Sequence, residues 1–334
     1  MNCPTSAPPL WYSFLTHRSN LSLKRLDVGT TFRTILLGLF SCLAVSAATF
    51  GTVVVIGGHA SDLALDESRG LLYIANFGGR RVDVMSTSTN TLRSAITGLP
   101  GEPGSLALSP DHRYLLVTNY DNCSPAPGLS CDFQTQPGTV PQLTVIDLVS
   151  NARQTVNIPP ATPSTTTPPT TPPSPSIPLA MAFGGGSKAL LVTSTAIFLV
   201  DPTTKPPTFV QQASPAVALT AAPLPTTFGT YPPQILQASI GVSGDQQTII
   251  VLAQGSVTTS SGTPAAGTQL IIKYNVASGA LTAVSDTSTP TLGPRVVSVD
   301  RHGVNFVAGW SLFNQQYVLL AEYSWPSSLI PQGR

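Results

Sequence analysis

The chain has 334 residues, of which 42% are hydrophobic and only 9% are charged, and its formal net charge is +1. Such a chain lacks the clustered positive charge that nucleic acids and anionic membrane surfaces attract. Its 32 prolines and 27 glycines would interrupt long helices, whereas short strands joined by turns tolerate them. The composition therefore predicts an all-β protein that does not bind nucleic acid.

Residues 1–50 are predicted to be a presequence. Basic residues up to Arg33 precede an apolar run that ends in small side chains, which is the order of a secretory signal peptide, and cleavage is favoured after Ala47. The uncharged stretch continues to Gly58, so an uncleaved membrane anchor is an alternative, and Cys42 allows a less favoured lipoprotein interpretation. We expect an exported protein, located in the periplasm, at the cell surface or outside the cell, that contacts a membrane only if this segment stays uncleaved.

The remaining chain, residues 51–334, contains a repeated pattern of four short strands. Each copy has two apolar residues at alternate positions, a polar turn, a second apolar strand and then outer strands. The five copies lie at 62–92, 105–156, 180–201, 239–275 and 296–321, and the third strand of the last copy is predicted at Tyr317–Ala321. One such sheet cannot bury its apolar faces alone, whereas sheets that pack face to face around an axis can. The pattern predicts a β-propeller of four-stranded blades, five of which are visible.

Three segments of this pattern resemble the YVTN-type β-propeller repeat. Residues 109–119 read Ser-Pro-Asp-His-Arg-Tyr-Leu-Leu-Val-Thr-Asn, Leu72–Asn76 is a close variant, and Leu143–Asp147 is similar to the strand that follows. The resemblance is strong over 61–158 and diffuse over 178–334. It implies a bacterial exported or surface protein, and because such proteins usually have seven blades, the chain is either a small ring or, as favoured, an incomplete seven-bladed one.

Two insertions interrupt the repeats. The Pro/Thr/Ser-rich segment 159–178 has almost no apolar side chains to bury and is predicted to be an extended spacer. Cys123 and Cys131 are the two cysteines that follow the presequence, and seven Pro/Gly-rich residues separate them. In an oxidising compartment this spacing predicts a local disulfide.

Few residues suggest chemistry, and the sequence predicts no catalytic residues, no metal site and no cofactor. His112 and His302 occupy matching turns, and Asp147 and Asp201 follow the third strand of their copies. Such repeated placement favours a turn-forming role over metal binding or catalysis. Aromatic side chains near the end of the second strand are candidate ligand contacts at one mouth of the ring: Phe77, Tyr120 and Trp310.

The favoured function is a non-catalytic binding or protein-interaction module with a protein or carbohydrate partner at the propeller mouth. One alternative is an enzyme similar to propeller lactonases that acts on a sugar lactone. Such an enzyme needs charged residues that converge on the axis, and Glu102 and Arg113 are its testable candidates. The other alternative is a structural protein of the cell envelope, with 159–178 as a stalk-like spacer.

Overall fold

The computed structural model describes residues 53–120, 140–161, 176–213, 234–258, 264–286 and 296–322. The chain divides into two units, Met1–Val53 and Val54–Arg334, and every described strand belongs to the second. The predicted presequence, most of the predicted spacer, and both Cys123 and Cys131 lie outside the described residues. The described residues contain strands and no helix, so none of them forms a helix that could cross a membrane.

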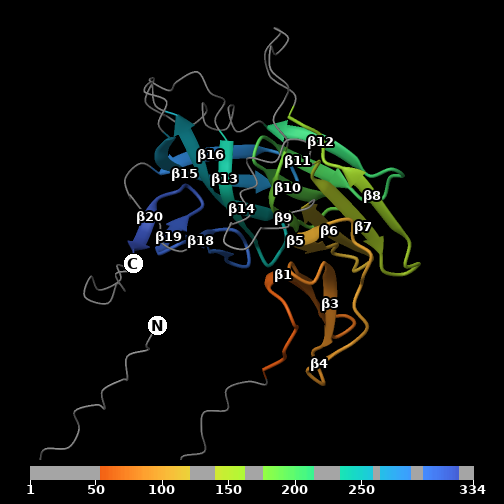
Figure 1. The fold of residues 1–334 in the computed structure, drawn as a ribbon. Coiled ribbons are helices and arrows are strands. Elements are labelled where there is room, and N and C mark those ends of the chain that lie inside the picture. The colour runs from red at the N-terminus through yellow and green to blue at the C-terminus, as the bar shows by residue number, and fades with distance from the viewer. Residues whose placement is uncertain are drawn as a thin grey trace, which may run out of the picture. The chain divides into compact units, whose positions relative to one another are not determined.

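The strands form five four-stranded antiparallel sheets, each with its strands in chain order (Figure 1). The first sheet contains β1 (Ala60–Asp66), β2 (Leu71–Asn76), β3 (Arg81–Ser86) and β4 (Thr91–Leu92). The second contains β5 (Glu102–Leu108), β6 (Tyr114–Tyr120), β7 (Gln142–Asp147) and β8 (Arg153–Asn157). The third contains β9 (Pro178–Phe183), β10 (Ala189–Thr193), β11 (Ile197–Asp201) and β12 (Thr208–Ala213).

The fourth sheet contains β13 (Gln234–Val242), β14 (Thr248–Thr258), β15 (Pro264–Asn275) and β16 (Leu281–Asp286). The fifth contains β17 (Val297–Val299), β18 (Asn305–Ala308), β19 (Ser311–Asn314) and β20 (Leu319–Glu322). The all-β prediction and the five four-stranded units are thereby confirmed.

The fifth sheet corrects one strand assignment. Its third strand is β19, whereas the run predicted for that place, Tyr317–Ala321, supplies a turn residue and most of the fourth strand. Tyr317 has a φ of 63°, a left-handed conformation that interrupts a strand. β19 follows β18 after a turn of two residues and is less apolar than the run that comes after it. The third strand was therefore assigned to that later, more apolar run.

Successive sheets pack through apolar side chains. The first strands are neighbours in chain order, with β1 beside β5, β5 beside β9, β9 beside β13 and β13 beside β17. One buried apolar cluster lies at each of these four junctions. At the first junction, Ala64 and Tyr73 of the first sheet pack with Leu106 and Leu115 of the second. Burial of sheet faces against one another therefore holds the five units together.

The strands of the second sheet are strongly apolar because neighbouring sheets cover both of its faces. Leu106 belongs to the cluster shared with the first sheet, and its neighbour Ala107 belongs to the cluster shared with the third. In β6, Leu115, Leu116 and Val117 are all fully buried, because alternate side chains point to opposite faces and both faces are covered. The prediction that such continuous apolar runs are covered on both sides is confirmed.

Polar side chains close the turns, as predicted for the repeated aspartates. Asp147 accepts hydrogen bonds from the backbone N–H groups of Val149 and Ser150, and Asp201 accepts one from the N–H of Thr203. These bonds satisfy backbone donors that would otherwise lack a partner in a tight turn. The turn-forming interpretation of Asp147 and Asp201 is therefore confirmed.

The two matching histidines contact the preceding sheet. His112 has a φ of 58°, and its Nδ1 lies 3.0 Å from Oδ1 of Asp66 without a hydrogen bond between them. Nδ1 of His302 lies 3.5 Å from Oδ2 of Asp245. Both histidines thus sit in turns between first and second strands and contact an aspartate of the preceding sheet: Asp66 ends β1, and Asp245 lies in the turn after β13.

Candidate functional site

The first strands of all five sheets line one cavity of about 330 Å³. Its lining residues come from β1, β5, β9, β13 and β17 and the residue before β17: Ser61, Asp62, Ser105, Leu179, Ala180, Met181, Ala238, Ser239, Ile240, Val296 and Val297. A second cavity of about 310 Å³ shares Asp62, Met181 and Ile240 with it. A space built from the innermost strands of every sheet is held in shape by the same packing that holds the fold together.

Asp62 is the one charged residue that lines either cavity. Its Oδ1 accepts a hydrogen bond from the N–H of Leu63 and its Oδ2 one from the N–H of Leu106, each 2.8 Å long. Burial raises the pKa of Asp62, and these two bonds offset part of that rise. Because a carboxylate offers about four acceptor positions, Asp62 retains the capacity to accept hydrogen bonds from a ligand.

Tyr120 joins the second and third sheets near Asp62. It is the last residue of β6, and its hydroxyl donates a hydrogen bond to the carbonyl oxygen of Pro178, the first residue of β9. Burial raises the pKa of Tyr120, and the negative charge of Asp62 raises it further. The Tyr120 ring lies beside Gly104, whose carbonyl oxygen accepts a hydrogen bond from the hydroxyl of Ser61 in the cavity lining. The Tyr120 hydroxyl is therefore a buried structural group close to the Asp62 side of the cavity.

The predicted aromatic contacts are partly brought together. The rings of Phe77 and Tyr120 lie 6.0 Å apart at an angle of 58°, which is a favourable tilted arrangement. Trp310 lies in the turn between β18 and β19, at the corresponding end of the fifth sheet, and is half-buried. The structure joins Phe77 to Tyr120, and a ring of ligand-binding aromatics that includes Trp310 stays a prediction.

Glu102 supplies a second carboxylate at this end of the sheets. It begins β5 directly opposite Tyr120, and its side chain is only 12% exposed. Its Oε1 lies 3.9 Å from Nε of Arg80, and its Oε2 is buried without a hydrogen-bond partner. Burial raises the pKa of Glu102, and the positive charge of Arg80 offsets part of that rise. An unpartnered buried carboxylate oxygen is costly, and such groups concentrate at functional sites.

Glu102→Gln is expected to stabilise the protein near neutral pH by about 1 kcal/mol, because it removes a buried charge that lacks a full set of partners. A carboxyl whose pKa is raised by folding holds its proton more tightly in the folded state. Wild-type stability therefore falls as the pH rises from the ordinary pKa of Glu, 4.5, through the higher folded value. The variant should lack this decline. The difference in stability between variant and wild type should therefore disappear in acid, where Glu102 is protonated in the folded and the unfolded state.

Chemical denaturation at neutral and acid pH measures this difference. Glu67→Gln is the matched control, because Glu67 is exposed in the turn after β1 and should give little change at either pH. A gain that is equally large at both pH values would show that ionisation of Glu102 is not its cause.

Arg113 lies far from Glu102 along the second sheet. Arg113 stands in the turn that joins β5 to β6, whereas Glu102 and Tyr120 pair at the opposite end of that hairpin. The Arg113 guanidinium binds the Asp147 carboxylate, with NH2 2.9 Å from Oδ2. The two charged residues considered for a lactonase-like site therefore do not converge.

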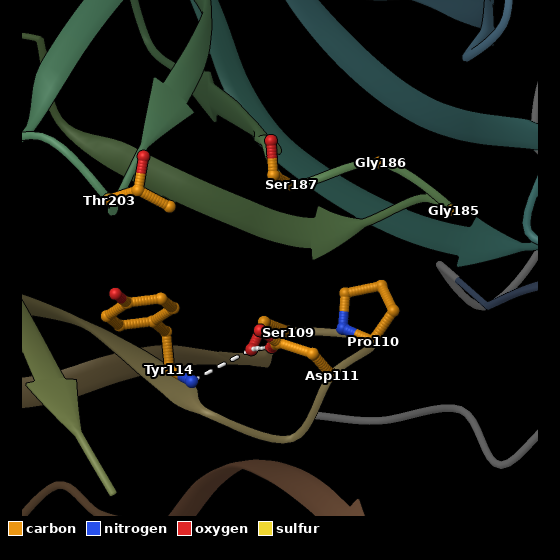
Figure 2. A pocket seen from close by; sticks show the side chains of 8 residues that line it. All are labelled: Ser109, Pro110, Asp111, Tyr114, Gly185, Gly186, Ser187 and Thr203. Carbon is orange, nitrogen blue, oxygen red and sulfur yellow. Dashed lines mark hydrogen bonds between the residues drawn. The ribbon is translucent and has the colours of Figure 1, made fainter. Parts of the chain in front are cut away.

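A smaller cleft of about 200 Å³ lies between turns of the second and third sheets (Figure 2). Ser109, Asp111 and Tyr114 form one side, and Gly185–Ser187 with Thr203 form the other. Burial would raise the pKa of Asp111, but hydrogen bonds from the Ser109 hydroxyl and the Arg113 N–H outweigh it, and the pKa is lowered. These polar groups are engaged in their own turn, so the central cavity is the stronger candidate for a ligand site.

Five antiparallel four-stranded sheets, packed face to face with their first strands around a common cavity, define a β-propeller fold. The sequence matches no protein-family model and no curated protein sequence. The YVTN resemblance therefore remains a sequence-based expectation, and the propeller architecture that it implied is confirmed.

Many solved structures resemble the chain, and the likeness of three of them is weak. Hydrazine synthase of Kuenenia stuttgartiensis is 12% identical over 81% of each chain, with a TM-score of 0.39. The Cps50 (Swd1) β-propeller domain of Myceliophteria thermophila is 11% identical over 83% of this chain and 90% of that one, with a TM-score of 0.40. A structure of a nidogen/laminin complex is 10% identical over 81% of this chain and 82% of that one, with a TM-score of 0.47.

Proposed function

We propose that this β-propeller is a non-catalytic binding module and that its ligand is a carbohydrate held in the cavity beside Asp62. The observation that carries this proposal is the composition of the cavity, which combines one carboxylate with serine and apolar side chains. Sugars present both hydroxyl donors and apolar C–H faces. Asp62 can accept hydrogen bonds from the sugar hydroxyl groups, while Leu179, Met181 and Val297 contact the apolar C–H faces.

The size of the cavity supports this choice of ligand. A volume of about 330 Å³ is at the lower end of the range for small-molecule sites, so it suits one or two sugar rings rather than a long chain. Phe77 and Tyr120 pack on each other and line neither cavity, so the proposed sugar contacts come from the first strands alone. A protein partner at the same end of the sheets is the competing proposal.

Titration calorimetry with a set of mono- and disaccharides tests the proposal. Asp62→Ala should weaken binding of the best sugar at least ~10-fold, because it removes a charged acceptor whose hydrogen bonds contribute about 1.5–3 kcal/mol. Asp201→Ala is the control, since Asp201 lies in the turn after β11 and does not line the cavity. Equal weakening by both variants, or no sugar bound by the wild type, would contradict the proposal.

An enzymatic role on a sugar lactone has one observation in its favour, the buried Glu102 with its unpartnered oxygen and raised pKa. Such a carboxyl has the properties of a general acid or base. Lactone hydrolysis that is lost in Glu102→Ala but kept in Arg113→Ala would favour an enzyme over a binding module. Equal, low turnover in the wild type and both variants would support binding alone.

The proposal includes export, since the presequence has the pattern of a signal peptide. Fractionation of cells that express the full chain, with sequencing of the mature N-terminus, tests it. A new N-terminus at Ala48 in protein recovered outside the cytoplasm would support the predicted cleavage, and full-length protein in the cytoplasm would contradict export.

A further inference from the structure

The two central cavities follow one another along the first strands. In β1, Ser61 and Asp62 line the cavity of about 330 Å³ (the first cavity), whereas residues 62–65 line the cavity of about 310 Å³ (the second cavity). In β9 the order is the same, with 179–181 in the first cavity and 181–183 in the second. Three residues line both cavities, so the cavities meet beside Asp62, Met181 and Ile240. One elongated ligand that lies along the strands can therefore occupy both.

The backbone edges of the first strands form part of the cavity walls. Runs of consecutive residues line the second cavity, among them 62–65 and 106–108. Because successive side chains of a strand point to opposite faces of its sheet, a wall built from consecutive residues includes the strand's edge. Each first strand is the end strand of its sheet, so its outer edge pairs with no strand of the described residues. Backbone N–H and C=O groups on these edges are therefore turned toward the cavities.

The hydrogen bonds of the second sheet show which backbone groups these are. The N–H of Ser109 donates to the carbonyl oxygen of Tyr114, and hydrogen-bonded and non-hydrogen-bonded pairs alternate along an antiparallel hairpin. The N–H groups of Leu106 and Leu108 therefore point away from β6. In agreement with this direction, the Leu106 N–H donates to Oδ2 of Asp62 across the junction with the first sheet.

The same pattern recurs in the third and fourth sheets. The N–H of Ser243 donates to the carbonyl oxygen of Thr248, so the N–H of Ile240 points away from β14. Met181 occupies the position of Leu106 in its own sheet, and its N–H faces the cavities in the same way. The walls thus combine one fixed carboxylate acceptor with backbone donors. A hydroxyl group both donates and accepts hydrogen bonds, so the hydroxyl groups of a sugar match this arrangement.

Leu63 and Leu65 add apolar surface to the wall of the second cavity. They are 55% and 50% exposed, and both line the second cavity but not the first. Sugars present apolar C–H faces, and burial of these faces against the two leucines is favourable. The second cavity therefore offers the same two kinds of surface as the first, with backbone groups in place of the serine hydroxyls.

We propose that the ligand is a linear oligosaccharide that runs along the first strands through both cavities. This inference rests on the proposed function, because it extends the sugar site beside Asp62. Each cavity has a volume at the lower end of the range for small-molecule sites and suits one or two rings, so the site holds about two to four rings. One end of the oligosaccharide lies beside Asp62, and the other lies against Leu63, Leu65 and the edges of β5 and β9.

Titration calorimetry of the full chain with cello-, malto- and chito-oligosaccharides of one to six rings tests the inference. In the series that binds, affinity should rise at least ~10-fold from one ring to three, because each added hydrogen bond contributes about 2- to 10-fold. It should then level off beyond about four rings. Equal affinity at every length, or an affinity that still rises at six rings, would overturn the inference and leave sugar binding beside Asp62 intact. Binding of no saccharide at any length would overturn the proposed function as well.

The double variant Leu63→Ser/Leu65→Ser tests the place of the added rings. It removes apolar surface from the second cavity alone, so the ratio of three-ring to one-ring affinity should fall at least ~3-fold. Leu92→Ser/Val149→Ser is the control, because both residues are exposed and line neither cavity. An unchanged ratio in the folded double variant would overturn the inference.

Leu65→Pro tests the backbone edge of β1. The N–H of Leu63 donates to Asp62, and the N–H of Leu65, two residues further on, points to the same side of the strand. Proline removes this N–H at an edge position that tolerates it, whereas Leu65→Ala keeps it. The three-ring to one-ring ratio should be about 2- to 10-fold lower in Leu65→Pro than in Leu65→Ala. Circular dichroism confirms folding, the serine variant decides if the proline variant does not fold, and equal ratios would exclude the β1 edge from the site.

Discussion

Replacing Leu106 by alanine is expected to lower the free energy of unfolding by about 2–5 kcal/mol, the range for large-to-small changes in a packed core. Leu106 is 4% exposed and belongs to the cluster between the first and second sheets, together with Leu115 and Ile146. The substitution removes apolar contacts and leaves a cavity that two hydrogen-bonded sheets cannot easily collapse to fill. Urea denaturation followed by circular dichroism measures the loss.

Leu63→Ala is the matched comparison, because Leu63 occupies the same position of the repeat and differs only in its surroundings. It is 55% exposed, so most of its surface is already in contact with water, and the expected loss in dilute protein is under about 1 kcal/mol. Equal losses for the two variants would mean that the face of the first sheet is covered as fully as the internal junctions are.

The sequence predicted most of the architecture because the repeat sets it. The alternation around Leu106 and the polar turn at Ser109–Arg113 mark a hairpin by local chemistry alone, and the same signals recur in each copy. The third strand of the fifth copy was assigned incorrectly, because the local apolar pattern is weak there. The four-residue strand β19 lies between two turns, and its identity depends on pairing with β18 and β20 rather than on its own composition.

The site was less predictable, because cavity lining depends on how separate sheets meet. Asp62 was not chosen from the sequence, although one signal was available: it occupies the place held by Ser105 and Ser239 in other copies of the repeat. A carboxylate at a position where other copies have a hydroxyl group is not explained by turn formation or core packing, and it therefore indicates a functional role. The separation of Glu102 from Arg113 was also predictable, because the hairpin puts Glu102 at its open end and Arg113 in its turn.

Gly104→Ala is expected to destabilise the protein by about 1–3 kcal/mol through overpacking beside the candidate site. A Cβ added at Gly104 would lie 2.1 Å from Cε2 of Tyr120, far inside van der Waals contact. The Tyr120 ring cannot simply turn away, because it packs on Phe77 and its hydroxyl binds the carbonyl oxygen of Pro178. We therefore expect the ring to be displaced, with loss of the bond to the third sheet. Thermal and urea denaturation measure the cost, and weaker sugar binding would accompany it.

Gly186→Ala is the control for Gly104→Ala, since the nearest atom to an added Cβ there is Cγ1 of Val276 at 3.8 Å, an ordinary contact. A double-mutant cycle then isolates the cause. If the clash with the ring is responsible, Gly104→Ala should cost almost nothing in a Tyr120→Ala background, because the atoms that the new methyl group meets are gone. Equal costs in the two backgrounds would instead place the effect in the β5 backbone, where the pairing with β6 shifts register between Pro103 and Leu106. Glycine would then be needed at position 104 for the course of the strand rather than for the position of Tyr120.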